Sequence, residues 1–163
     1  MKNILNEIFK ESKIKNKESP DSNELYERTW STSIETNNEK LVVNYDDEEH
    51  YCNSIVIKTD QEEEEIAKEL GYKVIRIPYW IQIDSVTMKH YFGMDVEIKT
   101  EYPHGFGNTN VYPASFCEKG IERFSQELKM LPNEIKYEVI ISLRNKIKEY
   151  ETDYIIPKAL RIM

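Results

Sequence analysis

LVVNYDDEEHY, residues 41–51, opens the stretch that decides the fold of this 163-residue chain. Its first half is apolar and β-branched apart from Asn44, which predicts a buried strand that ends in an acidic cluster. QEEEEIAKEL follows at 61–70, and its early glutamates suit the positive N-terminal end of a helix that Thr59 or Asp60 can cap. The pattern predicts a strand followed by a helix.

GYKVIRIPYW, residues 71–80, closes the stretch. Gly71 can end the helix because glycine adopts a left-handed conformation without steric cost. KVIRI predicts a second strand at 73–77, and Pro78 stops it. Arg76 alternates with two isoleucines, so it points to the opposite face of this strand. We expect it to pair with nearby carboxylates rather than to contact a phosphate.

The C-terminal part of the chain has a helical pattern. Ser115 and Glu118 make a capping box that predicts a helix to about Leu131. Pro132 begins another, with apolar residues on one face. The chain is therefore predicted to be α/β first, with additional helices over 114–150.

Composition restricts the classes of function. The net charge is −8, with 30 acidic and 22 basic residues, and ten of the carboxylates lie between Asp46 and Glu69. Affinity for nucleic acids depends largely on Lys and Arg neutralising phosphates. The charge therefore disfavours tight non-specific binding to nucleic acid and favours a basic protein partner, or no charged partner.

The two cysteines, Cys52 and Cys117, are far apart in the sequence and lack metal-ligand spacing. They are interpreted as reduced packing thiols, and we do not expect a disulfide. The sequence has no apolar run of about 18 residues and no signal-peptide pattern. These patterns favour a cytoplasmic protein without a membrane segment.

The stretches VVNYDDEEHY and ELGYKVIRIPYW resemble the PD-(D/E)XK nuclease superfamily, in particular its small members related to very-short-patch repair endonucleases. The resemblance covers about 50 residues. It implies a restriction-endonuclease-like α/β fold with a mixed sheet, and a nuclease-like core at 31–93 within a single domain of residues 1–163.

The resemblance also implies a site. Asp46 takes the place of the family's aspartate at the strand end, His50 that of its histidine, and Asp60 that of its helix aspartate. These three are the candidate catalytic residues. A family member would use its carboxylates to hold Mg²⁺, which prefers oxygen ligands and would orient and acidify a water molecule.

The departures from the family pattern concern the charged positions. Ser33 stands where the family has its first aspartate, Asn44 where it has a glutamate, and Glu63 where its helix has a basic residue. Serine and asparagine are neutral and cannot supply the charge that holds Mg²⁺. The resemblance therefore implies a degenerate metal site.

Two functions remain open. The first is a nuclease-derived domain that acts by binding a protein or nucleic-acid partner, for example in immunity or defence. The alternative is an active Mg²⁺-dependent endonuclease with a relocated carboxylate site, in which Asp46, Glu48 and Glu49 are the metal ligands. In an interpretation without a functional site, Asp46 to Glu49 is an acidic turn in solvent and His50 is a packing residue. A helper subunit for a catalytic partner is a third possibility.

Overall fold

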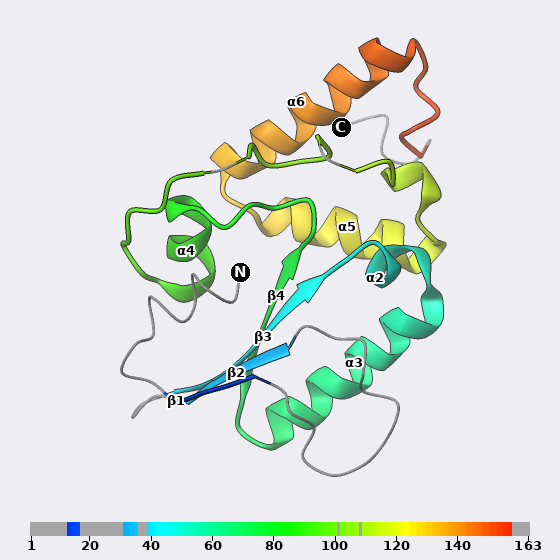
Figure 1. Cartoon of the computed structure of the whole chain (residues 1–163). Helices are drawn as coiled ribbons and strands as arrows, with labels where there is room; N and C mark the ends of the chain where they lie inside the picture. Colours follow the sequence, from blue (N-terminus) through cyan, green and yellow to red (C-terminus); the bar gives the residue numbers. More distant parts are fainter. Residues whose placement is uncertain (1–12, 17–30, 36–38, 101, 108, 158–163) are drawn as a thin grey trace. The chain divides into compact units, whose positions relative to one another are not determined.

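The computed structural model describes residues 13–16, 31–35, 39–100, 102–107 and 109–157 (Figure 1). They divide into two compact units. Unit 1 takes its residues from Met1–Asp47 and Lys58–Pro78, and unit 2 from Glu48–Ile57 and Tyr79–Met163. The single domain expected from the sequence stays a prediction. The apolar spacing at residues 1–12 predicts a short amphipathic helix, which lies outside the described residues.

Unit 1 contains a four-stranded mixed sheet in the order β1-β2-β3-β4. The first three strands are antiparallel neighbours, and β4 runs parallel to β3. The sheet confirms the mixed α/β class, and both predicted strands are present within it. The strands are β1 (Lys13–Asn16), β2 (Ser31–Glu35), β3 (Lys40–Asp46) and β4 (Lys73–Pro78).

Helix α3 (Ser54–Glu69) connects the parallel pair β3 and β4 and begins before the predicted cap. The prediction of a cap at Thr59 or Asp60 was wrong. Asn53 precedes the helix, and its side-chain oxygen accepts a hydrogen bond from the Ile55 N–H at 3.0 Å, as an N-cap residue does. Gly71 ends the helix as predicted, with φ of 80°.

The two faces of the sheet differ in polarity because side chains alternate along a strand. One face carries the buried apolar side chains Ile34, Val43, Ile75 and Ile77. Asn44, which pairs in register with Arg76, lies on the other face. Helix α3 lies over this polar face, since its Asp60 forms an ion pair with Arg76 at 2.7 Å.

Unit 2 is helical in its described residues, and none of the helices described in either unit is long and apolar enough to cross a membrane. The capping box predicted at Ser115 and Glu118 was wrong, because Cys117 is the N-cap of α5 and its side chain makes no cap bond. The helices are α2 (Glu49–Cys52), α4 (Ser85–Phe92), the 3-10 helix η2 (Pro113–Ser115), α5 (Glu118–Met130) and α6 (Asn133–Tyr150).

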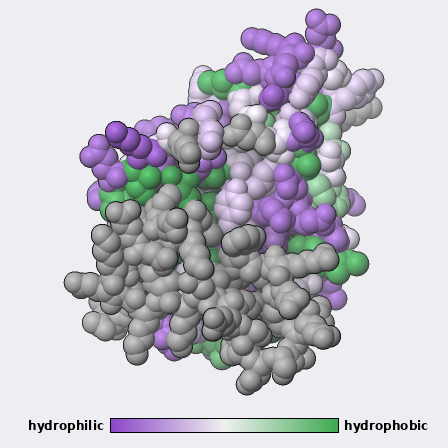
Figure 2. Space-filling model, in the orientation of Figure 1, coloured by the Kyte–Doolittle hydropathy of each residue, from purple (hydrophilic) through white to green (hydrophobic). Residues whose placement is uncertain are grey.

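The inner face of α6 is apolar, as the sequence predicts. Ile135, Val139 and Leu143 recur at helical spacing and are buried. The other side is mostly polar, although Tyr137 and Ile141 are exposed on it, and Figure 2 shows hydrophilic residues over the outer end of this helix. Helix α6 therefore covers the core of unit 2 with one face.

An aromatic cluster fills the core of unit 2. Trp80 is 1% exposed and packs edge-to-face against Phe124, with ring centroids 5.0 Å apart. Phe106 stacks on Trp80 at 6.2 Å. Trp80 is thus a core residue rather than a platform for nucleic-acid bases.

The YPHGFG segment reaches this core through a close approach to α6. Gly105 has φ of 105°, and a Cβ placed there would lie 2.2 Å from the Ser142 Oγ. The same Oγ accepts a hydrogen bond from the Phe106 N–H at 2.9 Å. Only glycine combines this backbone conformation with this contact.

We predict that Gly105→Ala lowers the free energy of unfolding by about 2–4 kcal/mol, through strain at positive φ and overpacking against Ser142. Urea unfolding followed by tryptophan fluorescence measures the change. Gly107→Ala is the matched control, because no atom lies within 4 Å of its added Cβ. Equal stability of the two variants would contradict the close approach.

Candidate functional site

The candidate site lies where β3 ends beside β4. Asp46 is the last residue of β3 and pairs in register with Pro78. Asn44 lies two residues earlier, on the same face, next to Arg76 of β4. Because β3 and β4 are parallel, both strands bring their carboxyl ends to the same edge of the sheet.

Arg76 bridges two buried carboxylates. Its Nη1 lies 2.8 Å from Asp46 Oδ1, and its Nη2 lies 2.7 Å from Asp60 Oδ1. The side chain of Asp46 is 0% exposed and that of Arg76 is 11% exposed. The predicted pairing of Arg76 with nearby carboxylates is confirmed. The alternative interpretation of an acidic turn in solvent does not hold for Asp46, which is buried, although Glu49 is exposed.

Asp46 and Asp60 are buried in unit 1 and could contribute carboxylate oxygens to a metal ion, and His50 is buried in unit 2. A ligand oxygen of Asp46 and one of Asp60 lie within 4.8 Å of each other. Carboxylate oxygens and an imidazole nitrogen suit several divalent cations. The donor types therefore fit a metal ion, but Arg76 already takes one oxygen from each carboxylate.

Glu48 and Glu49 belong to unit 2 and make contacts of their own there. Glu48 Oε1 accepts a hydrogen bond from the Thr109 hydroxyl at 3.1 Å. Glu49 lies in the first turn of α2, with its Oε2 3.5 Å from Asn53 Nδ2. Their role as metal ligands stays a prediction.

Three buried polar atoms at Arg76 lack a hydrogen bond of good geometry among the described residues: Asn44 Oδ1, Arg76 Nε and Arg76 Nη2. Of these, Nη2 still forms the ion pair with Asp60. Leaving such groups unpaired costs about 1–3 kcal/mol each. Asn44 is 5% exposed and stands where the family resemblance implies a glutamate. Ser33 of β2 pairs with Val42 and therefore lies on the same face of the sheet as Asn44.

Within unit 2, α5 anchors the short helix α2 that carries His50. The Tyr51 hydroxyl donates to Glu127 Oε2 at 2.6 Å, and Arg123 Nε donates to Glu127 Oε1 at 2.9 Å. Arg123 Nη1 also donates to the His50 carbonyl oxygen at 3.3 Å. Sequence reasoning missed the contacts of Tyr51 and His50 with α5 because they join residues more than 70 positions apart.

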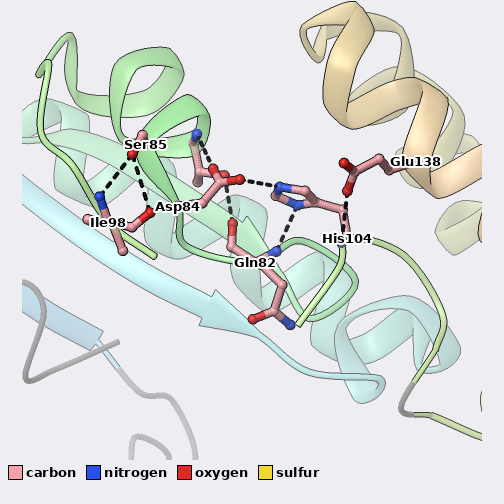
Figure 3. Close-up of polar contacts among 7 residues, drawn as sticks. Gln82, Asp84, Ser85, Ile98, His104 and Glu138 are labelled. Carbon is pink, nitrogen blue, oxygen red and sulfur yellow. Dashed lines mark hydrogen bonds and ion pairs between the residues drawn. The ribbon is translucent and has the colours of Figure 1, made fainter. Parts of the chain in front are cut away.

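A second polar centre, also missed, joins Asp84 and His104 in unit 2 (Figure 3). Asp84 Oδ2 lies 2.9 Å from His104 Nε2, and Asp84 Oδ1 accepts from the Thr87 N–H at 2.8 Å as the cap of α4. The Gln82 N–H donates to His104 Nδ1 at 2.9 Å. The Glu138 carboxylate accepts from the His104 backbone N–H at 3.2 Å.

These contacts assign a structural role to His104. A backbone N–H can only donate, so Nδ1 accepts and the proton of the neutral ring is on Nε2, which donates to Asp84. Both ring nitrogens are thus engaged, and neither is available as a general base. Burial alone would raise the pKa of Asp84, but the hydrogen bonds from Thr87 and His104 outweigh it and lower this pKa.

Comparison with protein-family models, with curated proteins and with solved structures gave no match for this chain. The likeness to PD-(D/E)XK nucleases therefore rests on the residues quoted from the sequence.

We predict that Asp84→Ala lowers the free energy of unfolding by about 2 kcal/mol at pH 7, because it removes a helix cap and leaves His104 without its acceptor. The pKa of Asp84 is lowered from 3.8 in the folded state. Its stabilisation is therefore full above that value and is lost as the pH falls through the folded pKa.

Urea unfolding between pH 3 and pH 7 measures this effect. The difference between wild type and Asp84→Ala should shrink towards the acid end. Asp95→Ala is the control, because Asp95 pairs with Lys89 at an exposed position and should change stability by less than about 0.5 kcal/mol. A difference that grew in acid would contradict the assigned charge of Asp84.

Proposed function

We propose that the chain is a nuclease-derived domain with a degenerate metal site, and that it acts by binding a protein or nucleic-acid partner. The observation that carries the proposal is the Arg76 bridge. Asp46 and Asp60 occupy positions where the resembled family has acidic site residues, and both bind the same guanidinium, at 2.8 and 2.7 Å. A side chain of the protein thus supplies positive charge where a divalent cation would otherwise be needed.

The neutral residues around the bridge support this proposal. Asn44 and Ser33 share the sheet face of Arg76 and stand where the family has carboxylates. If Asn44 and Ser33 were carboxylates, two more negative charges would lie on the sheet face of Arg76, and they would favour a divalent cation. Because both residues are neutral, the charges of Arg76 and the two aspartates sum to a single negative charge, which attracts a divalent cation weakly.

The order of the elements is also compatible with descent from a restriction-endonuclease-like fold. Helix α3 lies between the parallel strands β3 and β4 in the chain, and the sheet is mixed. The implied site residues come from the end of β3, from α2 and from α3. The resemblance implies the same order of strand aspartate, histidine and helix aspartate.

The charge of the chain favours a basic partner protein. The net charge is −8, and such a charge repels the phosphates of nucleic acids over distances of about 10 Å at moderate ionic strength. An acidic binding domain fits an immunity, antitoxin or anti-defence role, in which it would bind a basic protein. A nucleic-acid partner would require a local basic surface.

One observation favours the alternative, an active metal-dependent endonuclease. A ligand oxygen of Asp46 and one of Asp60, both buried in unit 1, lie within 4.8 Å of each other. If Arg76 swung away, the two carboxylates could hold Mg²⁺, which would orient and acidify a water molecule. Arg76 would then be free to contact a phosphate. Metal binding separates this alternative from the main proposal.

We predict that wild-type protein shows no saturable binding of Mg²⁺ or Mn²⁺ at millimolar concentration in calorimetric titration. Arg76→Met should lower the free energy of unfolding by about 3–5 kcal/mol, because it leaves buried carboxylates unpaired. Mn²⁺ should restore part of this loss in Arg76→Met by binding the folded state. Thermal unfolding with and without Mn²⁺ measures both effects.

Lys73→Met is the matched control, because it removes an exposed cation from the same strand. It should change neither stability nor metal response appreciably. Saturable binding by wild type that Asp46→Asn abolishes would instead support the active enzyme. It would justify cleavage assays on DNA and RNA.

We further predict that Ser33→Asp combined with Asn44→Glu creates Mn²⁺ binding, because it places the family's carboxylates on the polar face of the sheet. Ser33→Asn with Asn44→Gln is the size-matched neutral control. Calorimetry should detect Mn²⁺ binding in the acidic variant alone, and a fluorescent nuclease assay tests whether cleavage accompanies it. A folded acidic variant without metal binding would count against a nuclease-derived site.

A further inference from the structure

The two cysteines of unit 2 meet where α2 contacts α5. Cys52 is the last residue of α2, and Cys117 is the N-cap of α5. The Cys117 N–H donates a hydrogen bond to the Tyr51 carbonyl oxygen at 3.1 Å. The fold therefore brings the backbones of two cysteines that lie far apart in the sequence close together.

This hydrogen bond sets the separation of the two residues. From standard bond lengths, a 3.1 Å bond between Tyr51 oxygen and Cys117 nitrogen puts the Cα atoms of Cys52 and Cys117 about 5–7 Å apart. Disulfides usually join Cα atoms that are roughly 4.4–6.8 Å apart. The backbone is thus already positioned for a bridge.

The joint between the two helices is tight. A Cβ added at Gly120 would lie 1.8 Å from the Tyr51 carbonyl oxygen, so the first turn of α5 meets α2 backbone to backbone. The Tyr51 side chain is fully buried beneath it. The end of α2 and the beginning of α5 therefore cannot separate without breaking this packing.

Both thiols can react. Cys52 and Cys117 are free and half-buried, so a small oxidant can reach them. Burial raises the pKa of Cys52, and Glu49, Cys117 and Glu48 raise it further by their charge. The influence of Cys117 on this pKa agrees with the short separation. A raised pKa keeps Cys52 mainly in the thiol form, so its oxidation is slow.

We infer that Cys52 and Cys117 form a reversible intramolecular disulfide when hydrogen peroxide is the oxidant. One thiol loses its proton, and the thiolate attacks a peroxide oxygen, which breaks the O–O bond and gives a sulfenic acid and a hydroxide ion that takes up the proton as water. The second thiol attacks that sulfur, forms the S–S bond and releases the second water. Two electrons pass from the two sulfurs to one peroxide, and thiol–disulfide exchange with a dithiol reverses the reaction.

The bridge would fasten the end of α2 to the beginning of α5, two residues after His50. It would also close a long loop and so restrict the unfolded chain. The inference does not depend on the proposed function, since it concerns only the thiols and the backbone of unit 2.

The full-length protein is treated with hydrogen peroxide and analysed by intact mass and by peptide mapping without reduction. We expect a monomer that has lost two hydrogen atoms, one linked peptide pair containing Cys52 and Cys117, and a thiol count that falls from two to none. The melting temperature should rise by roughly 5 °C and return after dithiothreitol.

Cys52→Ser and Cys117→Ser are the matched controls, and neither should give the linked species. Oxidation in urea separates proximity in the fold from chance encounter, because the folded protein should form the bridge faster than the unfolded chain. Linked dimers, or a gain of two oxygen atoms at one cysteine without the intramolecular bridge, would overturn the inference.

Discussion

The ion pairs of Arg76 with Asp46 and Asp60 constrain the whole of unit 1. They join β4 to the end of β3 and to the middle of α3, at 2.8 and 2.7 Å. A slip of one residue in the pairing of β3 and β4 would turn Arg76 towards the apolar face, where nothing of opposite charge could meet it. Because buried charges are stable only when paired, this arrangement specifies both the strand register and the place of the helix.

Unit 2 depends on a different constraint, the close approach of backbone segments at glycines. Because Gly105 has no Cβ, the Ser142 side chain of α6 can approach its backbone closely. Because Gly120 has none, the Tyr51 carbonyl group can do the same. In each case a Cβ would occupy space already taken by another segment. These contacts let the aromatic core around Trp80 close without a gap, since close-packed interiors tolerate few voids.

The strand–helix–strand order was predictable from the sequence because it depends on local signals. The apolar residues of β3, the left-handed Gly71 and the stop at Pro78 act on their immediate neighbours. The start of α3 was not predictable, because SIVIKT is rich in β-branched residues that favour a strand. The cap is Asn53, which no sequence pattern singled out.

The family spacing predicts Asp46, His50 and Asp60 as site residues, and the alternation of side chains along the strand predicts the ion pairing of Arg76. The Asp84–His104 contact gives no local pattern, because its partners come from separate loops.

A cation carried on a side chain differs from a dissolved one in that it cannot diffuse away. Arg76 is covalently part of β4, so its local concentration near Asp46 and Asp60 is set by the fold and not by the surroundings. Guanidinium also stays protonated over the whole physiological range. The positive charge between these two carboxylates is therefore supplied by the chain itself, whatever the ions in the surrounding medium.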